Sequence, residues 1–186
     1  MSAYKVLLVY PNMMMSMLVP NAIGVFSALL KQEGFAVDLF DATLYRTDVD
    51  SSDERKAKTL QLRPFNLGDR GVMLKTTDME ADFHEKVAAS KPDLIAVSVV
   101  EDTFPIATRL LNSISRLNIP CVMGGVFSTY APDIVMAEPT IHYLCRGEGE
   151  GALIDLCHAL ASGEDPSKIP NLWVKRGDTI IKTEMR

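Results

Sequence analysis

Two glycine-containing segments near the C-terminal end carry the clearest signal of a ligand site. Gly124-Gly125 follows the short apolar run 121–123, and Thr129 comes shortly after it. A second apolar run, 141–145, ends in R-G-E-G-E at residues 146–150. Paired glycines directly after a buried strand occur where the backbone passes close to another body or needs a positive φ. We interpret the two segments as parts of one ligand crevice at one edge of a sheet.

Other side chains could also contact a ligand. The loop 11–21 has four methionines within five positions, and these form either an apolar floor for a large flat ligand or a small core cluster. The hydroxyl of Ser98 ends a buried strand and needs a partner, which is either a ligand or the neighbouring backbone. Glu101 and Asp102 are candidate acids, although an exposed pair is commonly just solvated. Glu148 and Glu150 also suit the first turn of a helix.

No catalytic set and no metal site are predicted. The chain lacks G-x-G-x-x-G and G-K-[ST], which disfavours a nicotinamide dinucleotide or a P-loop phosphate. There is no Ser–His–Asp order and no Cys–His pairing. The three cysteines form neither a disulfide framework nor a cluster-binding pattern, and the three histidines form no H-x-x-x-H pair.

Composition limits the class of protein. The 186 residues carry a net charge of −5, whereas nucleic-acid-binding proteins usually present a basic face. No apolar run approaches the ~20 residues of a membrane span, and the N-terminus has no signal-peptide pattern. We therefore expect a cytoplasmic protein with neither a nucleic-acid nor a membrane partner.

Apolar runs and helical patterns alternate along the chain, which predicts an α/β fold with a parallel sheet and helices on both faces. The expected strands are 5–10, 36–40, 93–100, 120–123 and 141–145. The expected helices are 22–33, with Asn21 as N-cap, and 78–89, 105–117 and 148–161.

Two regions interrupt this alternation. Residues 44–77 contain no convincing strand, only a charged patch at 53–56 that could be helical, and we interpret them as an insertion. Residues 171–175 and 179–183 flank R-G-D and predict a β-hairpin. We expect one domain over residues 1–170, followed at 171–186 by the hairpin as a connection to a downstream domain.

The special segments share one location in this predicted sheet. Ligands of open parallel sheets bind outside the carboxyl ends of the strands. The loops at that end are 11–21, 98–103, 124–129 and 146–150, which include every segment singled out above. This agreement predicts a ligand-binding domain.

With these motifs, the chain resembles the N-terminal cobalamin-binding domain of the B12-dependent radical S-adenosylmethionine (SAM) enzymes. The resemblance covers nearly the whole chain apart from about residues 44–77, and the order and spacing of its motifs are specific. The motifs are K-V-L-L-V-Y-P-N, F-A-V-D-L-F-D-A, K-P-D-L-I-A-V-S, V-M-G-G-V-F-S-T-Y-A-P, Y-L-C-R-G-E-G-E and I-P-N-L-W-V-K-R-G-D-T-I-I-K-T.

The resemblance implies a flavodoxin-like sheet of five parallel strands in the order 2-1-3-4-5, with the corrin over the strand ends. The nucleotide tail would lie in a groove lined by Ser98 and Gly124-Gly125. The expected cofactor-binding residues are Pro11, Asn12, Met13, Met14, Ser98, Val99, Val100, Glu101, Gly124, Gly125, Val126, Thr129, Gly147, Glu148 and Gly149.

Two motifs of related proteins are missing. Methionine-synthase-type domains supply a cobalt-binding histidine from D-x-H-x-x-G, but the matching loop here reads P-N-M-M-M-S-M. The resemblance thus implies base-off cobalamin without a protein histidine ligand. The triplet C-x-x-x-C-x-x-C is also absent, so an iron–sulfur cluster and SAM would belong to a missing domain, in the same longer chain or in trans.

Other functions stay open at this point. The main alternative is a degenerate flavodoxin-like docking or regulatory domain that binds no corrin. A nucleotide-binding half of a transferase is a weaker one. A receiver domain is disfavoured, because the acidic cluster after the first strand and the lysine after the fifth are missing.

Overall fold

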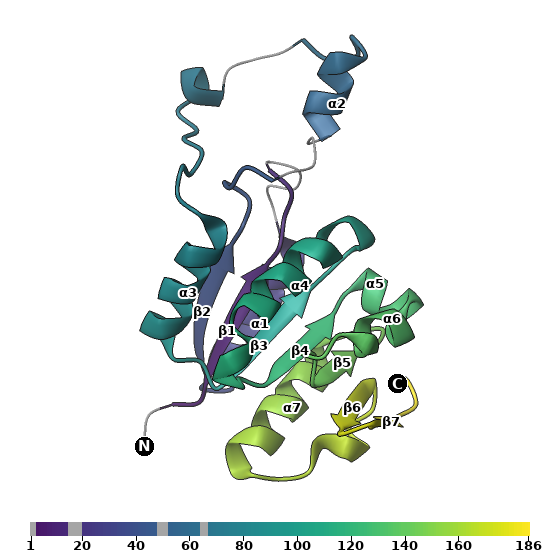
Figure 1. Ribbon diagram of the computed structural model, residues 1–186. Helices are drawn as coiled ribbons and strands as arrows, with labels where there is room; N and C mark the ends of the chain where they lie inside the picture. The colour runs from purple at the N-terminus through teal and green to yellow at the C-terminus, as the bar shows by residue number, and fades with distance from the viewer. Residues whose placement is uncertain (1–2, 15–19, 48–51, 64–66) are drawn as a thin grey trace.

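The fold is built on one mixed β-sheet. The computed structural model describes residues 3–14, 20–47, 52–63 and 67–186. Within these residues the sheet has seven strands in the order β2-β1-β3-β4-β5-β6-β7 (Figure 1). The strands are β1 (Lys5–Tyr10), β2 (Ala36–Asp41), β3 (Leu94–Ser98), β4 (Cys121–Gly124), β5 (Tyr143–Cys145), β6 (Leu172–Arg176) and β7 (Thr179–Lys182).

The first five strands pair in parallel, which confirms the predicted order 2-1-3-4-5. The predicted count of five strands is too small. The C-terminal hairpin continues the same sheet, because β6 pairs antiparallel with β5 and β7 pairs with β6. Pairing in this way satisfies the backbone groups that the short strand β5 would otherwise expose at an edge. The hairpin is therefore a structural part of the sheet.

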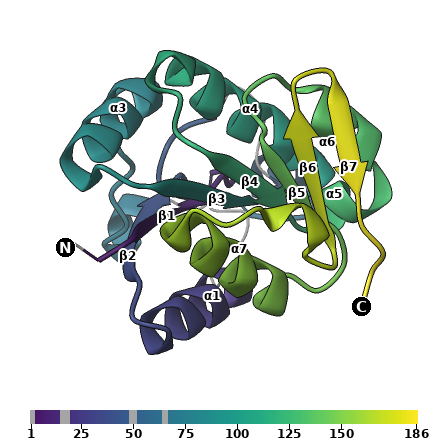
Figure 2. The ribbon, with the colours of Figure 1, turned by 90° about the horizontal axis from the view of Figure 1, so that it is seen from below.

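Helices cover both faces of the sheet (Figure 2). On one face lie α1 (Asn21–Gln32) and α7 (Glu150–Ser162). On the other lie α3 (Met79–Ser90), α4 (Phe104–Ser113) and α6 (Pro132–Ala137). Strand β1 shows why this layering forms, since Val6 and Leu8 join the core under α1 and α7 while Leu7 and Val9 join the opposite core. A continuous apolar run is what a strand buried on both faces requires.

Some helix boundaries agree with those predicted from the sequence, and others differ. Asp78 caps α3 by accepting a hydrogen bond from the Ala81 amide at 2.8 Å, and Lys91 ends this helix in a left-handed conformation before Pro92. The prediction that Asn21 caps α1 is wrong, because Asn21 is the first helical residue and Pro20 precedes it without a side-chain cap. The short helix α5 (Val126–Tyr130) begins within the predicted loop 124–129, and α6 lies in a segment for which no element was predicted.

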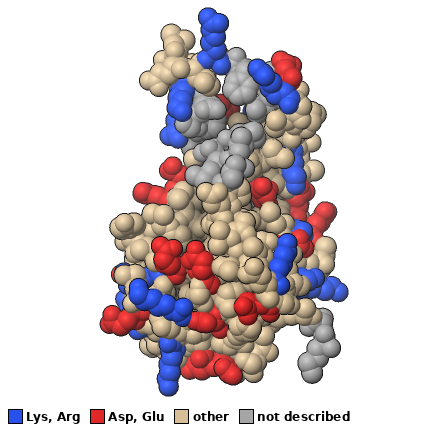
Figure 3. Space-filling view, turned by 180° about the vertical axis from the view of Figure 1, so that it is seen from behind, with Lys and Arg blue, Asp and Glu red and all other residues tan. Residues whose placement is uncertain are grey.

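The predicted insertion is an arm that projects beyond the carboxyl ends of the strands (Figure 1). It includes α2 (Ser52–Lys58), which confirms the helical interpretation of the charged patch, and a short 3-10 helix at Leu67–Arg70. Lys and Arg side chains gather around its far end (Figure 3). Its base is held in the core by Tyr45, which is 1% exposed and donates a hydrogen bond to Asp82 at 2.6 Å. No helix in the described ranges is long and apolar enough to cross a membrane.

Candidate functional site

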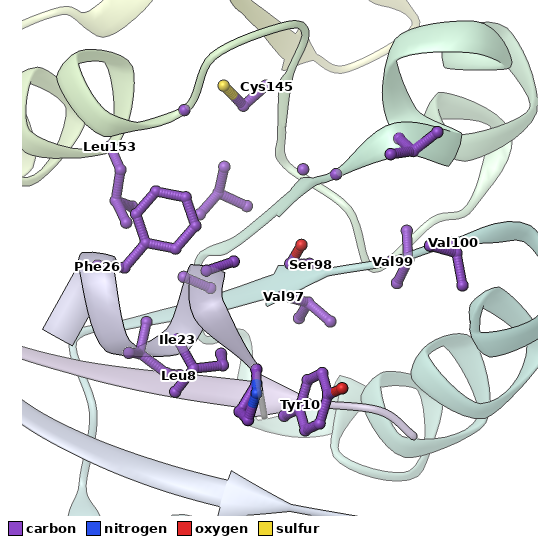
Figure 4. Close-up of a pocket in the computed structure, with 18 of the residues that line it drawn as sticks. Leu8, Tyr10, Ile23, Phe26, Val97, Ser98, Val99, Val100, Cys145 and Leu153 are labelled. Carbon is purple, nitrogen blue, oxygen red and sulfur yellow. The ribbon is translucent and has the colours of Figure 1, made fainter. Parts of the chain in front are cut away.

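A cavity of about 590 Å³ opens at the carboxyl ends of β1, β3 and β4, between the sheet and helices α1 and α7 (Figure 4). Each of the four loops predicted to share this rim contributes residues to its lining, so their convergence is confirmed. Twelve of the residues expected to bind a cofactor line the cavity: Pro11, Asn12, Met13, Ser98, Val99, Val100, Gly124, Gly125, Val126, Gly147, Glu148 and Gly149.

Three of the expected residues do not line it. Met14 is buried, and Glu101 is exposed in the 3-10 helix that follows β3. Thr129 lies on α5 and forms hydrogen bonds with the backbone of Gly125 and Gly147, which do line the cavity. Met15 and Met17 of the methionine loop lie outside the described residues, so the apolar-floor interpretation stays a prediction for them.

One end of the cavity is lined mostly by hydrocarbon side chains, beside the phenol of Tyr10, and was missed by the sequence analysis. We call it the hydrocarbon end and define it by Leu8, Ile23, Phe26, Ala96, Val122 and Leu153. Figure 4 shows the labelled members, Leu8, Ile23, Phe26 and Leu153, grouped at this end. The members come from β1, β3, β4, α1 and α7. Helical and strand periodicity marks such residues as inward-facing but does not reveal that they also line a cavity.

Polar groups lie nearer the middle and the mouth of the cavity. The Ser98 hydroxyl points into it (Figure 4), and among the described residues this hydroxyl has no hydrogen-bond partner. Burial raises the pKa of Cys145 to about 11, and the nearby carboxylate of Glu150 acts in the same direction. The sulfur of Cys145 therefore stays a neutral thiol near pH 7, which makes it a poor nucleophile and a poor metal ligand.

Carboxylates surround the mouth of the cavity. Asp102, Glu148 and Glu150 all line it, and none of them forms an ion pair within the described part of the chain. Of the predicted acid pair, only Asp102 reaches the cavity. Ionised carboxylates accept hydrogen bonds but cannot donate them. The mouth is therefore suited to a ligand that presents N–H or O–H groups.

Gly124 and Gly125 have different structural roles. Gly125 has a φ of 98°, and a Cβ at this position would lie 2.5 Å from the Val99 carbonyl oxygen and 2.7 Å from the Val99 amide nitrogen. The backbone of the chain itself thus requires glycine here. A Cβ on Gly124 would meet Cys145 Cβ at 3.6 Å, an ordinary contact. The interpretation that the glycines make room for a ligand stays a prediction, and for Gly125 internal packing is already a sufficient reason.

Two polar residues hold the glycine-rich loops in place. The Thr129 hydroxyl accepts a hydrogen bond from the Gly147 amide at 2.9 Å and donates one to the Gly125 carbonyl at 3.2 Å. Asn171, at the start of the hairpin, donates from its side-chain amide to the Glu148 carbonyl at 2.8 Å. The Thr129 bonds join the loop after β4 to the loop after β5, and the Asn171 bond joins the loop after β5 to the start of the hairpin. Asn171 was missed because a hydrogen bond between distant segments leaves no local sequence signal.

The histidines lie away from the cavity. His142 precedes β5 instead of lying within it as predicted, and its Nδ1 accepts a hydrogen bond from the Cys121 amide at 3.2 Å. His158 pairs with Glu33 at 3.1 Å, and His84 contacts the Ser113 hydroxyl at 3.1 Å. None of the three lines the cavity. Within the described residues, no cluster of His, Cys, Asp or Glu could hold a metal ion.

Comparison with solved structures shows the same fold in two enzymes. The radical SAM methyltransferase TsrM from Kitasatospora setae, solved with cobalamin and a [4Fe-4S] cluster bound, superposes with a TM-score of 0.73 at 24% identity. The match covers 99% of this chain and 29% of TsrM. The cobalamin-dependent SAM radical enzyme OxsB, solved with aqua-cobalamin and SAM bound, gives a TM-score of 0.71 at 18% identity, over 99% of this chain and 22% of OxsB.

Sequence comparison finds relatives of greater length. The anaerobic magnesium-protoporphyrin IX monomethyl ester cyclase of Synechocystis sp. is 36% identical over 109 residues, which are 56% of this chain and 22% of the cyclase. Tryptophan 2-C-methyltransferase of Streptomyces laurentii is 26% identical over 175 residues, 92% of this chain and 26% of the relative. The chain thus spans about a quarter of the length of these relatives.

A family model described as the B12 binding domain matches residues 16–156, which include three of the four cavity-lining loops entirely and the end of the first. The match extends over well more than half of the chain and agrees with the sheet order and the position of the cavity. The chain therefore belongs to the B12-binding domain family.

Proposed function

We propose that this chain binds cobalamin as the cofactor module of a radical SAM enzyme that performs methyl transfer or a related radical reaction. The corrin would lie over the carboxyl ends of the strands, and its nucleotide tail would enter the cavity. The observation that carries the proposal is the convergence of four loops on one cavity at the carboxyl ends of β1, β3 and β4. This is where open parallel sheets bind ligands.

The lining fits the chemistry of cobalamin. The hydrocarbon end suits the flat, largely apolar benzimidazole of the tail, which gains free energy when it leaves water. The Ser98 hydroxyl points into the cavity, has no hydrogen-bond partner in the described part of the chain, and would bond to the polar part of the tail. Asp102, Glu148 and Glu150 at the mouth would accept hydrogen bonds from the amide side chains that surround a corrin ring.

The same lining supports a base-off state without a protein ligand to cobalt. No histidine lines the cavity, and Cys145 is held as a neutral thiol. Met13 lines the cavity, but a thioether is a weak ligand for oxidised cobalt, so we assign it to packing. Bound cobalamin would supply methyl-transfer chemistry. The residues of this chain would bind it, orient it and exclude water from its tail.

The reaction itself requires more than this chain. The 186 residues contain no C-x-x-x-C-x-x-C triplet, whereas TsrM carries a [4Fe-4S] cluster and is several times longer. We infer that the cluster and SAM are held by another domain, in the same longer polypeptide or in a partner. The substrate of the complete enzyme would be selected there.

Titration with hydroxocobalamin tests the proposal. The purified chain should co-elute with cobalamin in gel filtration and change its visible absorbance. Electron paramagnetic resonance of the reduced cobalt(II) form should show no superhyperfine splitting from an axial nitrogen. Failure to co-elute would favour the docking or regulatory alternative, and nitrogen splitting that disappears in a histidine variant would contradict the base-off assignment.

A further inference from the structure

The four residues that follow β7, 183–186, turn to the side of the sheet that carries α1 and α7 (Figure 2). We call them the return segment. A Cβ at Gly147 would lie 3.5 Å from Met185 Sδ, and a Cβ at Gly151 would collide with the guanidinium of Arg186. The return segment therefore packs against the loop that follows β5 and against the start of α7.

The side chain of Asn171 lies between the return segment and the loop that follows β5, and it bonds to both. Its amide donates a hydrogen bond to the Glu148 carbonyl at 2.8 Å, and its oxygen accepts one from the Arg186 amide at 2.6 Å. The backbone of Asn171 takes part as well, because its amide donates to the Glu184 carbonyl at 2.9 Å and its carbonyl accepts from the Arg146 amide at 2.8 Å. A single residue, only 4% exposed, thus bridges two segments.

The loop that Asn171 holds forms part of the cavity mouth. Gly147, Glu148 and Gly149 line the cavity, whereas Asn171 does not. Glycines on both sides of Glu148 give this stretch of backbone wide conformational freedom, and Gly147 has a φ of 70°. The bond from Asn171 restricts that freedom at the Glu148 carbonyl. It therefore helps to fix the backbone from which the Glu148 carboxylate reaches the mouth.

The backbone conformation at Asn171 does not by itself require this side chain. Asn171 has a φ of 69°, in the left-handed region that asparagine enters more readily than most residues. Glycine would adopt the same conformation without strain and would carry no side chain. What asparagine adds here is the pair of hydrogen bonds, one to the cavity mouth and one to the return segment.

We propose that Asn171 is a positioning residue that couples the cavity mouth to the return segment. A ligand that immobilises the loop after β5 stabilises the bond to Glu148 and, through the same side chain, the bond to Arg186. By linkage, the docked return segment raises the affinity for that ligand by the same factor. The inference rests on the proposed function, with cobalamin as the ligand, and adds to it a residue outside the cavity lining.

Amide hydrogen exchange of the parent protein, with and without saturating hydroxocobalamin, tests the coupling. The Asn171 amide reports on the return segment, because it donates to the Glu184 carbonyl. Cobalamin should slow its exchange about 5–10-fold more than that of the Lys175 amide, which bonds to the His142 carbonyl at the other end of the same strand pair. Stabilisation of the whole fold by a ligand slows both amides alike, so the difference measures the coupling.

Two variants separate coupling from a general structural role. Asn171→Gly suits the positive φ and removes both side-chain bonds. Asn171→Asp keeps an oxygen for the Arg186 amide, but an ionised carboxylate cannot donate to the Glu148 carbonyl. Both variants should bind cobalamin about five-fold more weakly, the effect of losing one hydrogen bond, and should lose the selective slowing at position 171. A structural role alone would lower stability and leave that slowing in place.

Asn118→Gly is the matched control. Asn118 also has a positive φ, of 50°, but it lies before β4 at the amino end of the strands and outside the cavity lining. The same substitution there should leave both cobalamin affinity and the selective slowing unchanged.

The outcomes separate this inference from the function on which it rests. Equal slowing of the Asn171 and Lys175 amides in a parent protein that binds cobalamin overturns the coupling and leaves the proposed function intact. Selective slowing that persists in Asn171→Asp, or parental affinity in both variants, overturns the role of the side chain. If Asn171→Gly folds poorly by circular dichroism, Asn171→Asp and the parent decide the matter. Failure of the parent to bind hydroxocobalamin removes the proposed function, and this inference with it.

Discussion

The two faces of the sheet pack differently, although the same strands build both. Under α3 and α4 the core is closed by aromatic rings: Phe40 lies 4.9 Å from Phe83 and 5.8 Å from Tyr45, measured between ring centroids. Under α1 and α7 the core opens into the cavity at the carboxyl ends of the strands. The two faces of the sheet differ more in the size of their side chains than in the polarity of those side chains.

The central strand illustrates this difference. On the closed face, Val97 lies between Val9 and Met123. On the open face, the neighbouring position is Ala96, whose side chain is a single methyl group. Helix α7 adds another small residue, Ala152, to the same lining. Small residues at the middle of one face leave a void where the other face is filled, and a ligand of the right shape can occupy that void.

Removing an aromatic ring from the closed face should have the largest effect on stability. Phe83 is fully buried, so Phe83→Ala should lower the free energy of unfolding by about 3–5 kcal/mol. Phe26→Ala, on the cavity side, should cost less than half as much but weaken cobalamin binding more. Urea unfolding and cobalamin titration of both variants measure this crossover. Similar losses of stability would show that the two faces are packed alike.

Filling the void should affect binding more than folding. Leu153→Trp places a large ring in the hydrocarbon end and should weaken cobalamin binding by about 100-fold, if the ligand must then force a repacking of about 3 kcal/mol. Leu160→Trp, on the same helix but outside the cavity lining, is the matched control and should bind normally. If Leu153→Trp binds as the parent does, the tail lies elsewhere.

Much of the fold could be predicted because its signals are local. Buried parallel strands are continuous apolar runs, and the loops at their carboxyl ends contain the glycines and the isolated Ser98. These features predicted the strands and the four loops that line the cavity, whereas the strand order was implied by the resemblance to cobalamin-binding domains. The extension of the sheet to seven strands and the role of Asn171 depend on pairing between distant segments, which single-sequence patterns do not encode.

The hydrocarbon end could not be predicted for a different reason. Phe26 and Leu153 have the periodicity of ordinary core residues, and the same pattern would arise if no cavity lay beside them. Whether such residues also line a cavity depends on the position of the helices in three dimensions. The glycine pair lines the cavity, but its role in making room for a ligand stays a prediction, because a Cβ on Gly125 would already clash with the Val99 backbone.

A smaller effect is expected from the bond that joins the two glycine-rich loops. Thr129→Val keeps the shape of the side chain but leaves the Gly147 amide without its acceptor, and should cost about 1 kcal/mol of stability. Cobalamin binding should weaken modestly, because Gly147 itself lines the cavity. Thr129→Ser retains the hydroxyl and should restore both properties. Thermal unfolding and dialysis provide the measurements, and equal behaviour of the Val and Ser variants would contradict this role.

The smallest effect concerns the amino end of the sheet, away from the cavity, where His142 should couple stability to pH. Burial, and then the charge of Lys175, lower the pKa of His142 below its ordinary value. The Cys121 amide donates to Nδ1 of His142, and this bond requires a neutral imidazole.

Because the pKa is lower in the folded state, the unfolded chain binds more protons as the pH falls below about 6.5. The stability from neutral His142 is therefore fully present above that pH and is lost as the pH falls through the folded-state pKa. Urea unfolding should show this loss of stability between about pH 7.5 and about pH 5, a range that extends roughly one unit or more to either side of the ordinary histidine pKa. The His142→Gln variant should show a smaller dependence of stability on pH over the same range. Cobalamin affinity should change little over the same range, since His142 lies outside the cavity lining. A parallel loss of affinity that His142→Gln abolishes would show that the two ends of the sheet are coupled.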